Sequence, residues 1–110
     1  MAGAKVILVL GHTKCGAVKG ACDDAEIGNL TGLLDRIKPA VDKVGKSWTD
    51  GEKNSKNAGF VEAVGEENVL LVMENIKKDS PILKEMIEKG EIVLVGGYYD
   101  LENGVVRFVK

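Results

Sequence analysis

Apolar and polar positions alternate along the chain in a way that predicts strands and helices in turn. Residues 5–10 form a continuous aliphatic run, which is typical of a strand buried on both faces in a parallel sheet. Apolar side chains then recur at helical spacing, which predicts helices over residues 16–22, 29–44 and 57–78. Pro39 is expected to break or kink the second helix, and the polar stretch that follows it, residues 45–56, is interpreted as a loop.

The last third of the chain carries clear start and stop signals. Ser80 and Pro81 favour the start of a short helix, and Gly90 suits its end. Residues 92–95 read as a buried strand, and residues 98–109 as a hairpin with Asn103-Gly104 in a two-residue type I′ turn. We therefore expect an α/β fold, a parallel sheet flanked by helices with a C-terminal hairpin, in one domain spanning residues 1–110.

Composition narrows the possible partners. The 110 residues are 45% hydrophobic and 29% charged, with 15 basic and 17 acidic residues mixed along the chain. This balance lacks the basic stripe that nucleic acids require, and the longest apolar run is too short for a bilayer, which takes about 20 residues. No signal-peptide layout precedes the first strand, and two cysteines do not make a disulfide framework, so a cytoplasmic location is expected. So short a domain buries only about two-thirds of its unfolded surface, which favours a homo-oligomer, a dimer or higher.

The candidate chemistry lies where the first strand meets the first helix. His12 is the only histidine, and Cys15 follows three residues later, between Gly11 and Gly16. Open α/β sheets bind ligands at the carboxyl ends of their strands, and zinc accepts both imidazole nitrogen and thiolate sulfur. We interpret the two glycines as allowing a tight loop and close backbone approach to a bound group.

Two other interpretations of this segment stay open. A His-x-x-Cys pair also occurs as a hydrogen-bonded core histidine beside an inert thiol, and zinc needs more than two ligands. The loop from Gly11 to Gly16 could instead hold a small anion on backbone N–H groups. Cys22 is not a third ligand, because nearly two helical turns separate it from Cys15; it is interpreted as a packing residue.

The segment Gly11-His12-Thr13-Lys14-Cys15-Gly16-Ala17-Val18 closely resembles the Gly-His-Ser/Thr-x-Cys-Gly-Ala-hydrophobic signature of β-class carbonic anhydrases. The similarity continues through Asn68-Val69, Ser80-Pro81-Ile82, Gly90-Glu91-Ile92-Val93 and the stretch from Gly97 to Gly104, and so covers nearly the whole chain.

The resemblance implies a zinc lyase that interconverts carbon dioxide and bicarbonate. His12 and Cys15 match two of the family's three protein ligands to zinc, and Gly16 matches the region that lines the substrate site. The resemblance also implies dimers that exchange elements across the active site.

The chain departs from the family pattern in one place. The family's first zinc cysteine lies in a Cys-x-Asp-x-Arg motif on an earlier strand, and no such motif occurs here. The domain therefore resembles an N-terminally shortened, or truncated, relative. No residue is assigned as catalytic because the Asp-Arg pair is absent, and the expected enzyme activity is impaired. The alternative is a non-catalytic oligomeric module that binds a small anion or metal loosely at the loop from Gly11 to Gly16.

Overall fold

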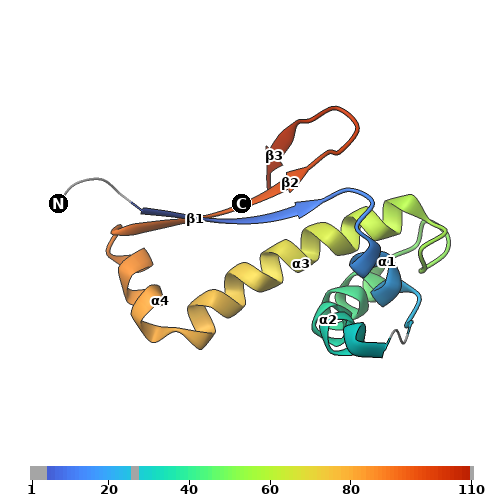
Figure 1. Cartoon of the computed structure of the whole chain (residues 1–110), viewed down its shortest axis with the longest axis horizontal. Coiled ribbons are helices and arrows are strands. Elements are labelled where there is room, and N and C mark those ends of the chain that lie inside the picture. The colour runs from blue at the N-terminus through green and yellow to red at the C-terminus, as the bar shows by residue number, and fades with distance from the viewer. Residues whose placement is uncertain (1–4, 26–27, 110) are drawn as a thin grey trace.

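A computed structural model describes residues 5–25 and 28–109 (Figure 1). In these two ranges the elements follow the order β1 (Lys5–His12), α1 (Gly16–Cys22), the 3-10 turn η1 (Gly28–Leu30), α2 (Thr31–Ser47), α3 (Ala58–Asp79), α4 (Pro81–Glu88), β2 (Ile92–Tyr99) and β3 (Val106–Phe108). No helix among these elements is long and apolar enough to cross a membrane. The expected α/β fold is confirmed.

The sheet has the order β1-β2-β3. Strands β1 and β2 run parallel, in a register that begins at Lys5 opposite Ile92 and ends at His12 opposite Tyr99. Strand β3 returns antiparallel to β2, which confirms the predicted terminal hairpin. In the described sheet β2 is therefore central, and β1 is an edge strand.

Helix α3 covers one face of the sheet (Figure 1). Val69 and Met73 of α3 form a small core with Tyr98 of β2. The contact is close because Gly96 has no side chain: a Cβ there would lie 2.5 Å from Met73 Sδ and 3.0 Å from Val69 Cγ1. Glycine in β2 therefore sets the distance between helix and sheet.

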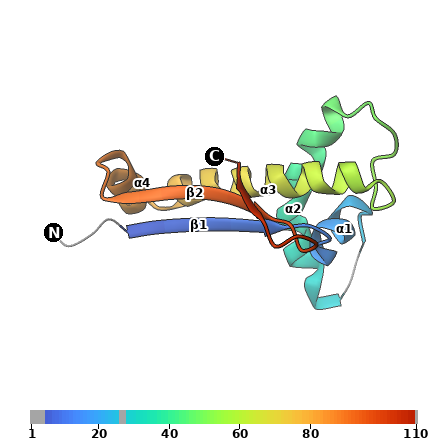
Figure 2. The same ribbon diagram turned by 90° about the horizontal axis from the view of Figure 1, so that it is seen from above.

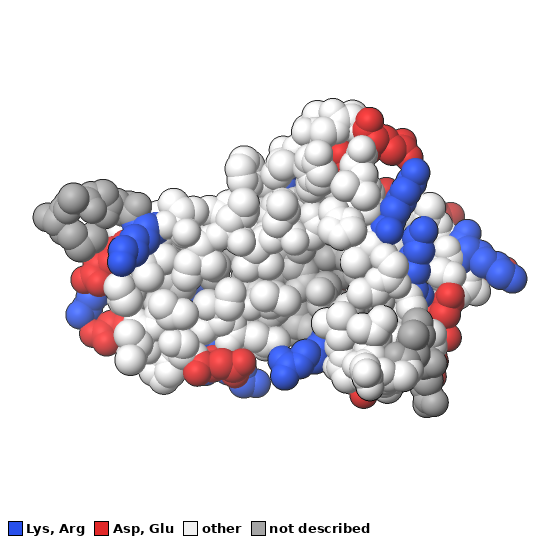
Figure 3. Space-filling model, in the orientation of Figure 1, with Lys and Arg blue, Asp and Glu red and all other residues white. Residues whose placement is uncertain are grey.

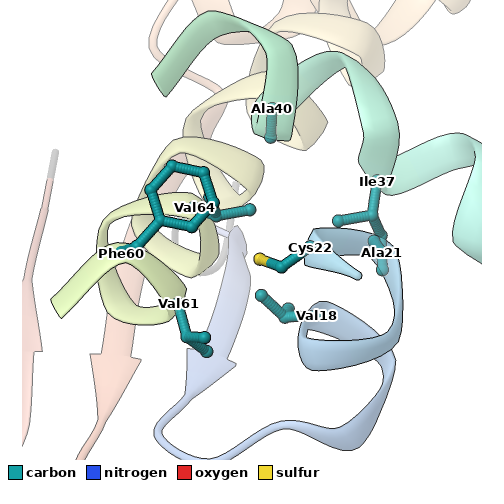
Figure 4. Packing of buried hydrophobic residues seen from close by; sticks show 8 residues of the cluster. All are labelled: Val18, Ala21, Cys22, Ile37, Ala40, Phe60, Val61 and Val64. Atoms are coloured by element: carbon teal, nitrogen blue, oxygen red, sulfur yellow. The ribbon is translucent and has the colours of Figure 1, made fainter. Parts of the chain in front are cut away.

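A second, larger core lies at the other end of α3, where α1 and α2 pack against it (Figure 4). Its buried members come from all three helices: Val18, Ala21 and Cys22 from α1, Ile37 and Ala40 from α2, and Phe60, Val61 and Val64 from α3. The Trp48 ring packs edge-on against Phe60, with 5.5 Å between centroids. This core fixes α1, and hence the loop that leads into it, against the N-terminal half of α3.

The helix ends largely follow the sequence signals. The Asn57 side chain caps α3 by accepting hydrogen bonds from the backbone N–H groups of Gly59 and Phe60. Ser80 caps α4 in the same way, and Gly90 follows that helix at a φ of +79°, a conformation that suits glycine. The predicted helix over residues 57–78 and the predicted short helix after Ser80 are confirmed.

The prediction that the first strand is buried on both faces is wrong. Val6, Leu8 and Leu10 are about half exposed or more, because α3 covers only the opposite face of β1. Figure 2 shows the strands from their open side, with α3 behind them and no helix in front. A continuous apolar run indicates a strand whose two faces are both buried, but it does not show which part of the fold buries each face.

Two local predictions are also corrected. Pro39 does not break α2, which continues to Ser47, so the loop begins at Trp48 rather than at residue 45. The hairpin connection is not a two-residue turn: residues 100–105 form the loop, and of Asn103 and Gly104 only Gly104 has a positive φ. The loop is closed by hydrogen bonds between Asp100 and Val105 and between Gly104 and Asp100.

Candidate metal centre

His12 ends β1 with its ring exposed on the open face of the sheet. Its Nδ1 lies 2.9 Å from the Thr13 carbonyl oxygen. With the proton on Nδ1, this contact is a hydrogen bond donated to the carbonyl, and the Nε2 lone pair remains available to a metal ion. Metal-binding histidines commonly make this kind of second contact to a backbone carbonyl.

Cys15 occupies the N-cap position of α1, half-buried at the edge of the larger core. Lys14, between the two candidate ligands, adopts a φ of +56°, which is uncommon for a residue with a side chain. Gly16 begins α1, and a Cβ there would meet no other atom within 4 Å. The tight turn is therefore made by Lys14 and not by glycine, which corrects the sequence interpretation.

Gly11 has a packing role rather than a ligand-binding one. A Cβ at this position would lie 2.9 Å from Val69 Cγ2 and 3.0 Å from the Tyr98 ring. Tyr98 also lies against Gly65 of α3, where a Cβ would lie 2.7 Å from its hydroxyl oxygen. Gly11 and Gly65 thus make room for one buried tyrosine ring between α3 and the strand that ends at His12.

The surroundings of Tyr98 combine burial with charge. Burial raises the pKa of Tyr98 to about 12, and the carboxylates of Glu62 and Glu66 add to the shift. Arg107 lies over the ring, 5.2 Å from its centroid, and forms an ion pair with Glu66. The hydroxyl therefore stays protonated at neutral pH, and the ring serves as a packing group.

Thr13 anchors the loop to the β2–β3 connection. It is buried, its N–H donates to the Tyr99 carbonyl oxygen at 2.9 Å, and its Oγ1 accepts from the Leu101 N–H at 3.0 Å. Next to it, Lys14 pairs with Glu102 on the surface, and this contact raises the pKa of Lys14. Sequence reasoning missed Thr13, although its place between the two candidate ligands was a usable signal.

The described residues bring His12 and Cys15 to the two ends of one short loop, but they add no third donor. Residues 5–25 and 28–109 contain no cluster of three or more His, Cys, Asp or Glu side chains able to hold a metal ion. Cys22 is buried in the larger core, and its burial raises the pKa of its thiol to about 11, with Asp23 adding to the shift. The interpretation of Cys22 as a packing residue is confirmed.

The carbonic anhydrase family model matches residues 1–106. The chain belongs to the β-carbonic anhydrase family. Among curated carbonic anhydrases, it is 27% identical over 100 residues to one from Synechococcus elongatus, covering 91% of this chain and 36% of the relative. It is 24% identical over 102 residues to one from Pseudomonas aeruginosa, covering 93% of this chain and 45% of the relative. The chain thus spans less than half the length of these curated relatives.

Solved β-carbonic anhydrases share the fold. The β-carbonic anhydrase CcaA aligns with a TM-score of 0.75 at 25% identity, covering 96% of this chain and 50% of that one. One of two tetrameric β-carbonic anhydrases from Sordaria macrospora aligns with a TM-score of 0.76 at 22% identity, covering 96% and 52%. CafA of Aspergillus fumigatus aligns with a TM-score of 0.68 at 27% identity, covering 96% and 49%. The described elements correspond to about half of a β-carbonic anhydrase chain.

Proposed function

We propose that this chain carries two ligands of a β-carbonic anhydrase zinc site, His12 Nε2 and Cys15 Sγ. The proposal is carried by the His12 ring, whose Nδ1 contacts the Thr13 carbonyl and whose other nitrogen is thereby left for a metal ion. Cys15 supports it, because it caps α1 three residues further on and is partly accessible. The reaction that we propose for the complete site is the family reaction, reversible hydration of carbon dioxide to bicarbonate.

The residues present fit zinc in kind but not in number. Imidazole and thiolate are both good zinc ligands, yet a catalytic zinc site uses three protein ligands and one open position. No third candidate ligand lies with His12 and Cys15 among residues 5–25 and 28–109. The sequence also lacks a Cys-x-Asp-x-Arg motif. We therefore propose that the 110-residue chain by itself holds zinc weakly and hydrates carbon dioxide poorly.

Bound zinc would supply a Lewis acid that lowers the pKa of water towards neutrality. The chain's own residues have the tasks of orientation and support. The Thr13 carbonyl fixes the tautomer of His12, while the Thr13 hydroxyl joins the loop to Leu101. Gly16 begins the helix beside the site with open space around it, so we assign its backbone to the wall that the substrate contacts.

We also propose a homo-oligomer, and a reducing compartment such as the cytoplasm. Two unpaired cysteines support the second proposal, because thiols persist where the cell keeps them reduced. The first is supported by the apolar open face of the sheet and by the tetrameric state named for the Sordaria macrospora relatives.

Cobalt and zinc binding test the ligand assignment. In equilibrium dialysis we expect the wild-type chain to bind up to one zinc per chain, and His12→Ala and Cys15→Ser to lose it. Cys22→Ser is the matched control, because this thiol lies in the larger core, and it should bind as the wild type does. Cobalt loading should give a thiolate-to-metal absorption band. Because the Cys15 thiolate produces this band, it should be absent in Cys15→Ser. Zinc retained by both ligand variants would refute the assignment.

A hydration assay separates the enzyme from the non-catalytic module. Stopped-flow measurement with saturating zinc should show weak activity that depends on His12. A chain with neither zinc nor activity, but with bicarbonate binding detected by calorimetry, would favour the module. One observation speaks against anion binding by this loop: the Thr13 N–H already donates to the Tyr99 carbonyl oxygen.

A further inference from the structure

A groove lies between α2 and α4, on a side of α3 that the sheet does not cover (Figure 1). Its volume of about 700 Å³ falls within the usual range of small-molecule sites. All three helices contribute to its lining, which includes Leu33 and Arg36 from α2, Leu71 and Ile76 from α3, and Leu83 from α4. No residue of the loop from Gly11 to Gly16 lines the groove, so it is separate from the candidate metal centre.

The face of α3 in the groove differs from the face that packs on the sheet. Val69 and Met73 lie against Gly96 of β2. Asn68 and Val72 line the groove, and each directly precedes one of these two residues, which places it about 100° around the helix. Val72 is 37% exposed, so an apolar part of the groove wall is in contact with water.

The lining combines an aliphatic wall with one cationic group. More than half of the lining side chains are aliphatic, and Leu33 among them is 49% exposed. Among the residues that the structure describes, Arg36 is the only Lys or Arg in the lining, and it forms no ion pair within residues 5–25 and 28–109. Its guanidinium group is a planar fork of N–H donors, which matches the geometry of a carboxylate.

The acidic side of the groove limits how many negative charges a ligand can carry. Asp79 lines the groove where α3 ends beside α4, whereas Arg36 belongs to α2 on the other wall. A second negative charge at the far end of a ligand would therefore approach Asp79. In the orientation of Figure 1, the surface between α4 and α2 has a few charged side chains at its lower edge and uncharged atoms above them (Figure 3). One charged head group and an uncharged chain fit this distribution.

We propose that the groove between α2, α3 and α4 binds a free linear aliphatic monocarboxylate. The carboxylate accepts hydrogen bonds from the Arg36 guanidinium, an arrangement that is often bidentate and is stronger than a hydrogen bond between neutral groups. The aliphatic chain lies along Leu33 and Val72 towards Leu83, where it removes apolar surface from water. This site is independent of the proposed zinc site, so its test can be carried out in EDTA, where failure of the zinc proposal has no effect on the result.

Calorimetric titration of the full chain with a series of acids tests the ligand class. We expect octanoate to bind with a dissociation constant of about 1 mM, and decanoate roughly tenfold more tightly, because two further CH₂ groups are buried. Octanedioate has the same chain length as octanoate but a carboxylate at each end, and it should bind more weakly because of Asp79. Nuclear magnetic resonance locates the site, since the side-chain amide signals of Asn68 and Asn75 in the groove should shift with octanoate.

Arg36→Met tests the head group, because it removes the charge and keeps an apolar stem. Octanoate affinity should fall by roughly tenfold or more, whereas neutral octanol should bind this variant as it binds the wild type. Lys46→Met is the matched control: it removes a positive charge from the same helix but outside the groove lining, and octanoate affinity should stay unchanged. Circular dichroism with each variant establishes that the chain is folded.

Three outcomes would overturn the proposal. The first is a wild-type chain that binds neither octanoate nor decanoate at millimolar concentration. The second is an equal loss of octanoate and octanol binding in Arg36→Met, because the arginine would then act only through the shape of the groove. The third is binding to phosphatidylcholine vesicles that contain decanoic acid without binding to the free acid, which would assign the chain to a membrane surface instead.

Discussion

Thr13→Val isolates the hydrogen bond that holds the candidate loop to the β2–β3 connection. Valine has nearly the shape of threonine and leaves the backbone bond to the Tyr99 carbonyl in place, but it removes the oxygen that accepts from the Leu101 N–H at 3.0 Å. The perturbation is therefore the loss of one acceptor at a residue that is only 8% exposed.

The expected loss in the free energy of unfolding depends on what happens to the donor, the Leu101 N–H, and to the acceptor, the Thr13 hydroxyl. An ordinary intramolecular hydrogen bond contributes about 0.5–1.5 kcal/mol, and a buried donor left without a partner costs about 1–3 kcal/mol. Leu101 is half exposed, so water can reach its N–H and replace part of the bond. Valine has no hydroxyl group, so the variant also avoids the desolvation cost of burying one, which offsets part of the loss. We expect a net loss of about 1 kcal/mol, towards the lower end of both ranges.

Urea unfolding at fixed protein concentration measures this loss. For an m-value of about 1.5 kcal/mol/M, the midpoint should fall by roughly 0.7 M. Amide hydrogen exchange provides the local readout, because the Leu101 N–H should exchange faster in Thr13→Val than in the wild type. Thr13→Ser keeps the oxygen and should preserve the protection of Leu101. Unchanged midpoint and unchanged Leu101 protection in Thr13→Val would show that this bond does not hold the loop.

Two further predictions concern groups outside the loop. Ser55 donates two hydrogen bonds to Asp23 and lowers the pKa of that carboxyl, so the contact stabilises the fold above about pH 4, and the stabilisation is lost as pH falls through the lowered value. Ser55→Ala should therefore lose less stability than the wild type between pH 6 and pH 3 in urea titrations, and equal losses would contradict the assignment. In the folded chain at pH 8, iodoacetamide should modify Cys15 well before Cys22, because burial raises the pKa of the Cys22 thiol to about 11. Peptide mass spectrometry reads the two sites separately, and equal labelling would show that the larger core opens.

Periodicity predicted most elements because it reports burial directly. The expectation that failed was the local one at Pro39, where a missing N–H and a ring clash usually cost about 3 kcal/mol and end a helix. Helix α2 continues because Leu34, Ile37 and Ala40 are buried on both sides of the proline, so packing along the helix outweighs the local preference. That packing involves α1 and α3, which are distant in sequence and invisible to a local pattern.

The turn after β2 shows the same limit. Asn-Gly favours a two-residue turn, but here Asp100 and Asn103 accept backbone hydrogen bonds from Glu102 and Val105, which stabilises a longer loop. Thr13 fixes that loop from 88 residues away. The motif predicted which residues stand at the candidate metal centre, whereas the left-handed turn at Lys14 and the anchor at Thr13 depend on long-range contacts that only the folded chain contains.

The alternation of β1 links the candidate metal centre to the open face. Val6, Leu8, Leu10 and His12 occupy every second position, so the pattern that leaves an apolar surface uncovered also directs the imidazole towards it. Gly11 holds this arrangement, because a larger residue turned towards α3 at that position would meet Val69 and Tyr98. A shift of β1 by one residue would bring His12 towards α3 and expose the side chains that now pack there. Any layer packed on the open face would therefore lie beside His12, the last residue of β1 on that face.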